Sequence, residues 1–306
     1  MPLLTTIPVL FFSVCLIWGT TWMAMALALE SIPPLAATGL RFLLTCPLLV
    51  FLARYNKVSL GFPLGRRWLL PVVAIGYFAV PFWLMIFGEA YVSSGLAAVI
   101  FANMPIAVML ASILFLKERF SFLQYLGLLL AIGCLIKILF NETALSDGQN
   151  WIGIVFLALA VVIHAVLYVV VRQYCQGIHV ITYNAVPSGV AAVLLILASI
   201  FIEMPDVSAF SARSCGAVAY LGLVAGVGGI LAYFKLNEKA TPFKASICFL
   251  VFPLIALFLD NQIKNNNLSG ESLALLIPLL LGIMLTKSSY SKLNLNWLVN
   301  YARYRN

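Results

Sequence analysis

Charged side chains are scarce in this sequence. Asp, Glu, Lys and Arg together make up 9% of its 306 residues, whereas 63% are apolar. Because roughly a quarter of the residues in soluble domains are charged, this composition excludes an ordinary soluble domain. The mean hydropathy of +1.07 agrees with that conclusion. The composition therefore predicts an all-α integral membrane protein.

Motifs that carry chemistry are also missing. The sequence contains no HExxH, no G-x-S-x-G and no Walker A lysine motif, so we expect neither an enzyme nor a cofactor. Its six cysteines show no CxxC or other metal-ligand spacing, so we expect no metal site and no disulfide framework. Without an ATP site, any transport must run down a gradient or be coupled to an ion, most simply a proton.

Long apolar runs, in contrast, are abundant. A helix of about 20 residues crosses the hydrocarbon core of a bilayer, and ten runs approach that length without the alternation of a membrane β-barrel. No basic residue precedes the first run, so we expect no cleaved signal peptide. The last run is short and contains Pro278. The predicted transmembrane helices are 7–29, 35–53, 69–88, 94–116, 122–140, 151–171, 178–202, 215–236, 242–259 and 272–286.

The basic residues fall mainly on one side of these ten spans. With the N-terminus in the cytoplasm, the even-numbered connections and the C-terminal tail carry 14 of the 18 Lys and Arg residues. The odd-numbered connections carry only Arg213 and Lys264. This distribution follows the positive-inside rule, so we expect both termini in the cytoplasm. It also explains the net charge of +8 without a nucleic-acid partner.

Ten spans divide into two sets of five, and an odd number per set inverts the second set in the membrane. We therefore expect two inverted five-helix repeats at 1–140 and 151–286, followed by a cytoplasmic tail at 287–306. At an offset of 148, residues 90–105 align with 238–253 with three identities in sixteen positions. So few identities could arise by chance between apolar segments, and the matched prolines, Pro105 and Pro253, are more informative.

Several stretches resemble one known family. The opening WGTTWMAMALALESIPPLAATGLRFLL (18–44) and the stretch GEAYVSSGLAAVIFANMPIAVMLASILFLKERFSFLQYLGLLLAIGCLI (88–136) resemble EamA-type transporters of the drug/metabolite transporter superfamily. The segment YLGLVAGVGGILAYFKLNEKATPFKASICFLVFPLIALFL (220–259) is similar to the matching part of the second half. The resemblance covers nearly the whole chain and implies a transporter, without indicating a substrate.

One segment departs from the family pattern. Where members of the family usually carry a second acidic turn after the ninth helix, this chain reads DNQIKNNNLSGES (260–272). The role of that turn is therefore in doubt here. A transporter fold that has lost transport and serves as a membrane scaffold or sensor is the alternative function that this departure leaves open.

Arg41 is a guanidinium inside the second predicted span, about 10 Å beyond Pro34 at 1.5 Å per residue. A mid-helix arginine costs roughly 2.5 to 3.5 kcal/mol on insertion scales. One interpretation is that it snorkels outward or caps carbonyl groups at the Pro33–Pro34 turn. The other is a gating ion pair with Glu30 or Glu89, both assigned to the same edge. Glu89 itself is either a solvated edge carboxylate or a group that titrates during transport.

Polar and aromatic residues near mid-membrane are candidates for a substrate cavity. Asn103 lies two residues before Pro105, and a proline frees a backbone carbonyl. We expect helix breaks at Pro105 and at its counterpart Pro253. Such backbone is tolerated only where protein or water surrounds it, so we expect a central cavity between the repeats.

Two pairs of residues align across the repeats at an offset of 146. Trp18 and Trp22 lie four residues apart in the first span, as do His164 and Tyr168 in the sixth. Residues four apart share a helix face, so these pairs are candidate walls of the cavity. Lipid-facing packing, or an imidazole bonded to a neighbouring helix, is the alternative. Further candidates for the lining, each with packing as its alternative, are Tyr77, Trp83, Tyr183, Tyr220 and Tyr233.

We expect a secondary transporter that moves small polar or amphipathic metabolites, such as amino acids or related compounds, by alternating access, with export as its direction. The expected partners are a small-molecule substrate and the lipid bilayer. The expected location is a bacterial inner membrane, and the expected assembly is a monomer or weak homo-oligomer. An intramembrane enzyme is disfavoured because paired catalytic groups are absent from the spans.

Overall fold

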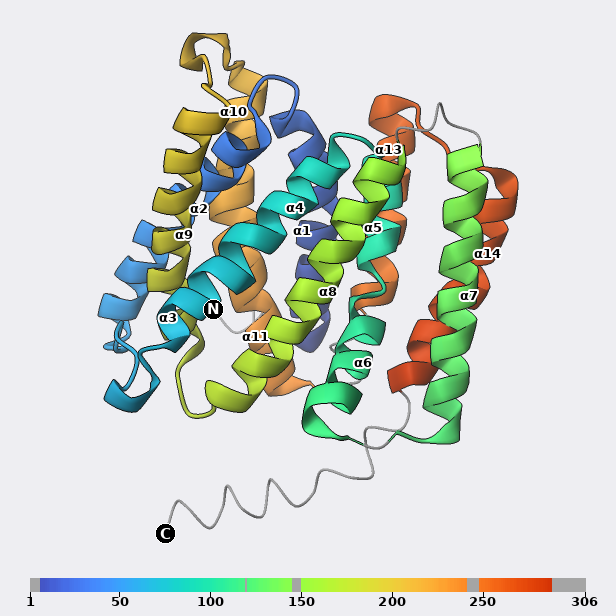
Figure 1. Cartoon of the computed structure of the whole chain (residues 1–306), viewed down its shortest axis with the longest axis horizontal. Coiled ribbons are helices and arrows are strands. Elements are labelled where there is room, and N and C mark those ends of the chain that lie inside the picture. Colours follow the sequence, from blue (N-terminus) through green and yellow to red (C-terminus); the bar gives the residue numbers. More distant parts are fainter. Residues whose placement is uncertain (1–5, 119, 145–149, 241–247, 288–306) are drawn as a thin grey trace.

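The computed structural model describes residues 6–118, 120–144, 150–240 and 248–287. In these ranges the chain forms helices and turns and contains no β-strand. The helices run side by side as one bundle, and we call its two ends the upper and lower ends as they appear in Figure 1. The turn that follows the first helix lies at the upper end, and the last described helix ends toward the lower end (Figure 1).

The helical elements follow the predicted runs closely. The first half contains α1 (Ile7–Ala28), α2 (Pro34–Tyr55), η2 (Leu64–Arg66), α3 (Leu69–Pro71), η3 (Val72–Ala79), α4 (Val80–Glu89), α5 (Ser94–Phe101), α6 (Met104–Leu116) and α7 (Phe122–Ala144). The second half contains α8 (Asn150–Tyr174), α9 (Val180–Ile202), η4 (Val207–Ala209), α10 (Ala212–Ala219), η5 (Tyr220–Gly229), α11 (Ile230–Lys239), α13 (Cys248–Lys264) and α14 (Gly270–Lys287).

Eight helical stretches of the described residues are long and apolar enough to cross a membrane, and they coincide with the first eight predicted spans. The ninth and tenth predicted spans correspond to α13 and α14, which are 17 and 18 residues long. The predicted start of the ninth span, at residue 242, lies outside the described residues. A crossing by each of these last two helices stays a prediction.

The third span of each half changes its winding near the middle. Between α3 and α4, η3 is a π-helix of eight residues, and between α10 and α11, η5 is a π-helix of ten residues. A π-helix has more residues per turn than an α-helix, is rare, and is frequently found at functional sites. The two segments thus occupy corresponding places in the two halves of the chain.

Helices of one half pack against helices of the other. The second span, α2, packs along the seventh, α9, and the fifth span, α7, packs along the tenth, α14 (Figure 1). The first span, α1, packs against α13 and the η5 span, while the sixth span, α8, packs against α4 and α6. The contacts of α1 and α8 thus correspond, with the two halves exchanging roles.

Glycines permit the closest of these approaches. A side chain on Gly88 of α4 would come within 2.9 Å of the Gly153 carbonyl oxygen of α8, and one on Gly153 within 2.6 Å of the Gly88 carbonyl oxygen. Between α7 and α14, Gly127 and Gly282 face each other in the same way. Small residues at such contacts are the usual means by which membrane helices approach closely.

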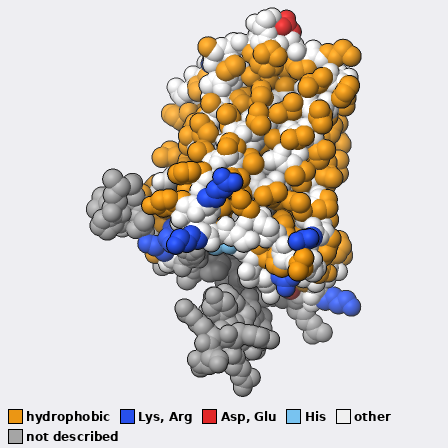
Figure 2. Space-filling view, turned by 90° about the vertical axis from the view of Figure 1, so that its left-hand side faces the viewer, with side chains coloured by type: hydrophobic (Ala, Val, Ile, Leu, Met, Phe, Trp, Pro, Cys, Tyr) orange, Lys and Arg blue, Asp and Glu red, His pale blue; other side chains and the backbone are white. Residues whose placement is uncertain are grey.

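The face of the bundle shown in Figure 2 is apolar along most of its length. In Figure 2, hydrophobic side chains cover the face in view, and Lys and Arg side chains gather toward its lower end. Acidic side chains are visible at the upper end (Figure 2). An apolar belt with basic residues at one end is the surface that a bilayer requires.

The two predicted helix breaks have different outcomes. Pro105 lies in the first turn of α6, and residues 102–103 separate that helix from α5, so the fourth span is broken as expected. Pro253, in contrast, lies inside the continuous helix α13, and the predicted break there is wrong. Its missing N–H is tolerated within the helix because proline in membrane helices is accommodated by packed neighbours.

Candidate functional site

Arg41 lies on α2 and is buried, with 4% of its surface exposed. Its guanidinium carbon lies 4.9 Å from the centre of the Phe82 ring of α4 and 5.5 Å from that of Phe42. Its Nη1 lies 4.0 Å from the sulfur of Met25, and its Nε has no hydrogen-bond partner in the described structure. The guanidinium is therefore held by aromatic faces instead of by a counter-charge.

The expected ion pair between Arg41 and Glu30 or Glu89 does not form. In the part of the chain that the structure describes, neither carboxylate lies within 4.0 Å of the guanidinium, and both oxygens of Glu89 lack a hydrogen-bond partner. The physical reason is depth: Glu30 lies in the turn after α1, where two other cations reach it. Arg41 lies farther down the bundle, and Phe82 on α4 precedes Glu89 by two helical turns.

His164 of α8 is also buried, with 5% of its surface exposed. Its ring meets three aromatic rings edge to face, with centroid distances of 5.3 Å to Tyr77, 5.0 Å to Phe82 and 5.7 Å to Phe101. Its Nδ1 has no hydrogen-bond partner in the described structure. Phe82 thus contacts both Arg41 and His164, and the two nitrogen-rich side chains share one aromatic wall.

The same group of rings extends to α1 and to the broken fourth span. Trp22 of α1 lies 5.3 Å from the Phe101 ring. Asn103, two residues beyond Phe101, donates from Nδ2 to the Val99 carbonyl oxygen at 2.9 Å, while its Oδ1 is buried without a partner in the described chain. We define the central cluster as Trp22, Arg41, Tyr77, Phe82, Phe101, Asn103 and His164.

Trp18 lies one turn before Trp22 and joins a second aromatic group. Its ring lies 4.7 Å from Tyr233 of α11, 5.5 Å from Phe249 and 6.3 Å from Phe252 of α13. Trp18 therefore contacts the third and fourth spans of the second half, and His164 contacts the third and fourth spans of the first half. The alignment of Trp18 with His164 is matched by equivalent surroundings.

The remaining candidate lining residues lie outside the central cluster. Trp83 packs on Phe156 of α8, with ring centroids 6.1 Å apart. Tyr220 hydrogen-bonds through its hydroxyl to Thr20 of α1. Tyr183 of α9 lies 6.4 Å from Phe234, and Tyr168 is 41% exposed.

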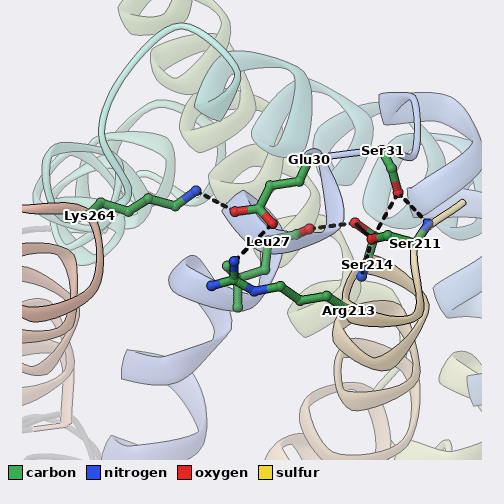
Figure 3. A network of polar contacts seen from close by, with 7 residues as sticks. All are labelled: Leu27, Glu30, Ser31, Ser211, Arg213, Ser214 and Lys264. Carbon is green, nitrogen blue, oxygen red and sulfur yellow. Dashed lines mark hydrogen bonds and ion pairs between the residues drawn. The ribbon is translucent and has the colours of Figure 1, made fainter.

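At the upper end, Glu30 ties three segments together (Figure 3). Its carboxylate accepts a hydrogen bond from Lys264 Nζ at 2.6 Å and lies 3.3 Å from Arg213 Nη1. The hydrogen bond from Lys264, reinforced by the charges of Lys264 and Arg213, lowers the pKa of Glu30 below its ordinary value. Beside it, the Ser31 hydroxyl bonds with Ser211 (Figure 3). The turn after α1 is thereby fastened to α10 and α13.

A hollow of about 250 Å³ opens at the same end. The charged side chains that line it are Glu30, Glu89, Asp260 and Lys264, and Ser94 is among its polar ones. Three carboxylates face one lysine here, and that lysine already binds Glu30. The hollow is therefore a polar depression of net negative charge between α1, α4, α5 and α13.

Two functional candidates at this end, both acidic, were not predicted from the sequence. Asp260 is buried and accepts a hydrogen bond from the Gly95 N–H at 2.9 Å. Glu203 accepts hydrogen bonds from the N–H groups of Leu35 at 2.7 Å and Ala36 at 3.0 Å, so it caps α2 from the end of α9. Each carboxylate binds a helix N-terminus, which favours negative charge. The sequence does not reveal these contacts because the carboxylate and the helix that it caps are far apart along the chain.

The chemistry available to these groups is binding. The described residues contain no group of three or more His, Cys, Asp or Glu side chains that could hold a metal ion. The central cluster instead offers a cation, an amide oxygen and an imidazole nitrogen, each with a free polar atom, surrounded by rings. Such a setting suits a small molecule that has both a polar head and an apolar body.

The sequence matches a known protein family in both of its halves. The model of the EamA-like transporter family matches the chain twice, at residues 5–140 and again at 151–288. The chain belongs to the EamA-like transporter family. It is therefore a multi-pass membrane protein of a transporter family. The two family matches coincide with the two halves whose helices contact each other.

The relatives of this EamA-like chain include proteins that are named as transporters. Protein PagO of Salmonella typhimurium is 49% identical over 281 residues, which cover 92% of each chain. An uncharacterized transporter of Buchnera aphidicola is 44% identical, covering 90% of this chain and 92% of the relative. The uncharacterized inner membrane transporter YedA of Escherichia coli is 28% identical, covering 89% and 86%.

A solved crystal structure shares the fold of this EamA-like chain. It superposes with a TM-score of 0.67 at 20% sequence identity, covering 92% of this chain and 95% of the other. At this identity the likeness concerns the fold alone. Family membership points to a transporter and not to an enzyme.

Proposed function

We propose that the protein is a secondary transporter that carries small amphipathic metabolites, such as amino acids or related compounds, across a bacterial inner membrane. The observation that carries the proposal is the central cluster. Arg41, Asn103 and His164 come from three different spans, and each retains a buried polar atom without a partner in the described chain. Buried polar groups are normally satisfied, and a bound substrate would satisfy these.

Alternating access is supported by the way that the halves pack. Trp18 and His164 have equivalent surroundings in opposite halves, as expected for two inverted five-helix repeats. Transporters of this kind bind substrate at the repeat interface near the midplane. The π-helices η3 and η5 provide points in both halves where the winding can change.

The proposed orientation places the lower end and both termini in the cytoplasm. The predicted cytoplasmic connections carry most Lys and Arg residues, and these side chains gather toward the lower end in Figure 2. The upper end would then face outward, with Glu30 holding it closed through Arg213 and Lys264. A carrier closed on its outer side receives substrate from the cytoplasm, which is consistent with export.

The test is substrate-dependent flux. Amino acids and nucleobase-like metabolites are first screened by thermal shift on the purified protein, and ligands that raise the melting temperature are then assayed in sealed proteoliposomes. We expect flux that empty liposomes lack, and loss of flux in Asn103→Leu and His164→Phe with the protein still folded. Tyr168→Phe, one turn from His164 and partly exposed, is the matched control that should retain flux.

Two results would contradict the proposal. Binding without flux for every ligand would favour the alternative of a transport-inactive scaffold or sensor. Full flux in both cluster variants would show that Asn103 and His164 serve packing alone.

A further inference from the structure

Glu89 is an unusual carboxylate. It is the last residue of α4, it is 5% exposed, and both of its oxygens are buried without a hydrogen-bond donor in the described chain. Buried carboxylates normally accept several hydrogen bonds or pair with a cation. Ser94, which lines the same hollow, also has a buried hydroxyl without a partner among the described residues. These groups therefore remain available to a ligand of the hollow.

The neighbouring carboxylate of Asp260 is in a different situation. Asp260 is 2% exposed, yet its Oδ2 accepts from the Gly95 N–H at 2.9 Å and its Oδ1 from the Asn266 amide at 3.2 Å. Both oxygens of Asp260 are therefore satisfied. Glu89, which lines the same hollow, has no such donors in the described chain. One carboxylate of the pair is thus hydrogen-bonded and the other is not.

The other charged groups around Glu89 do not compensate it. Within the hollow, Lys264 binds Glu30, and Arg213 binds the other oxygen of the same carboxylate. From α8, this end of α4 is contacted by Gly153, Phe156 and Leu157, which carry no charge. From α2, the charged group near α4 is Arg41, which meets Phe82 two turns below Glu89.

We propose that Glu89 is a proton-binding site whose occupancy closes the upper end of the bundle. A hydronium ion in the hollow transfers its proton to Glu89, one O–H bond forms, and water is released. The neutral acid can then be buried beside Asp260, with α4 resting on α8 at Gly88 and Gly153. When the proton leaves, an anion remains that lacks a donor and is repelled by Asp260, so the hollow opens to water.

The geometry favours a proton over a larger cation. Each Glu89 oxygen exposes less than 1 Å², so a metal ion that keeps its shell of water is too large to reach either oxygen. Sodium-like and divalent ions also need several oxygen ligands at once, and no cluster of three or more His, Cys, Asp or Glu side chains suited to a metal occurs in the described residues. A proton requires only the one carboxylate.

The test measures opening of the hollow in the full-length protein, so it requires no transported substrate. Val92 lines the hollow and is buried, whereas Ala90, which lies two residues earlier and also lines the hollow, is exposed. A single reporter cysteine is introduced as Val92→Cys or as Ala90→Cys, with the exposed Cys215 replaced by Ser in both. The labelling rate with a charged maleimide is followed from about pH 5 to about pH 9. The Ala90→Cys rate corrects for the pH dependence of thiol reactivity.

We expect the ratio of the two rates to rise at least about fivefold with pH when Glu89 is present, the factor implied by leaving a buried polar group unsatisfied. In Glu89→Gln, which remains neutral, the ratio should stay low and flat. Glu30→Gln is the control: it should raise the ratio at every pH while keeping its rise with pH. An unchanged pH profile in Glu89→Gln, or a flat profile in the parent, would overturn the proposal.

Infrared difference spectra keep the proposal testable if Glu89→Gln does not fold. The wild-type protein should show the C=O stretch of a neutral carboxylic acid that disappears as the pH is raised and the labelling ratio increases. A loss of that band without a change in the ratio would contradict the link between the proton and closure. These measurements use only the proton as ligand. If they contradict the role of Glu89, the proposed transport of metabolites is still tested separately by the flux assay.

Discussion

Replacing Arg41 by Met should make the protein more stable while removing its transport activity. Met fills a similar elongated volume and keeps contact with Phe42 and Phe82, but it carries no charge. In the described structure Arg41 has no counter-ion, and its Nε has no partner. The charge is therefore buried at a cost that the visible contacts offset only in part.

The size of the effect follows from these contacts. An arginine at the centre of a membrane helix costs roughly 2.5 to 3.5 kcal/mol. Cation–π contact with a desolvated ring returns about 1 to 2 kcal/mol, and Phe82 at 4.9 Å is the closer of the two rings. The difference predicts that Arg41→Met raises the free energy of unfolding by about 0.5 to 2.5 kcal/mol.

The assay is thermal unfolding of the purified protein, with flux measured on the same preparations. Arg54→Met is the matched control, because Arg54 lies at the exposed end of the same helix, and its replacement should change stability by less than about 0.5 kcal/mol. A clear loss of stability in Arg41→Met would refute the reasoning, since it would show that the guanidinium contributes to the fold. Retained flux would refute the assigned role in binding.

Three further predictions concern other parts of the bundle. Gly153→Val should destabilise the protein by roughly 1 to 3 kcal/mol in thermal unfolding, because its new side chain would meet α4, whereas Gly133→Val has open space and should be neutral. The pKa of Glu30 is lowered in the folded protein, so its ion pairs contribute their full stability above the ordinary pKa of glutamate, near pH 4.3. That stability is lost as the pH falls through the lowered pKa of Glu30. Melting temperature measured against pH should show this loss in the parent and not in Glu30→Gln. Engineered cysteines in 54–68 and 141–150 should react with an impermeant reagent from opposite sides of the membrane, and labelling of both from outside would contradict the proposed topology.

The positions of the helices could be predicted from the sequence because one physical quantity decides them. A bilayer requires about 20 apolar residues per crossing, and the polar breaks in this chain are sharp enough to place the described helices within a few residues. Proline effects were less predictable. Pro105 lies in the first turn of a new helix whereas Pro253 lies inside a continuous one, and the presence of a proline alone does not distinguish these two outcomes.

The partners of the buried polar residues could not be predicted in the same way. Phe82 and Phe101 connect Arg41, His164 and Trp22, but nothing distinguishes them among the 21 phenylalanines of the chain. Glu30 and its partner Lys264 are 234 residues apart. Their contact depends on how α1 and α13 pack, which hydropathy does not encode.

The partnership of α7 with α14 also constrains how the protein can be made. The Gln124 amide of α7 donates to the Thr286 carbonyl oxygen of α14 at 3.0 Å, and Gly127 faces Gly282. A ribosome that has just released α7 into the membrane has yet to synthesise every residue of α14. During that interval the face of α7 that carries Gln124 meets lipid or an insertion factor, and the nascent first half cannot reach its final packing. Quality control that samples the chain before its last helix is inserted would therefore encounter an incomplete bundle every time.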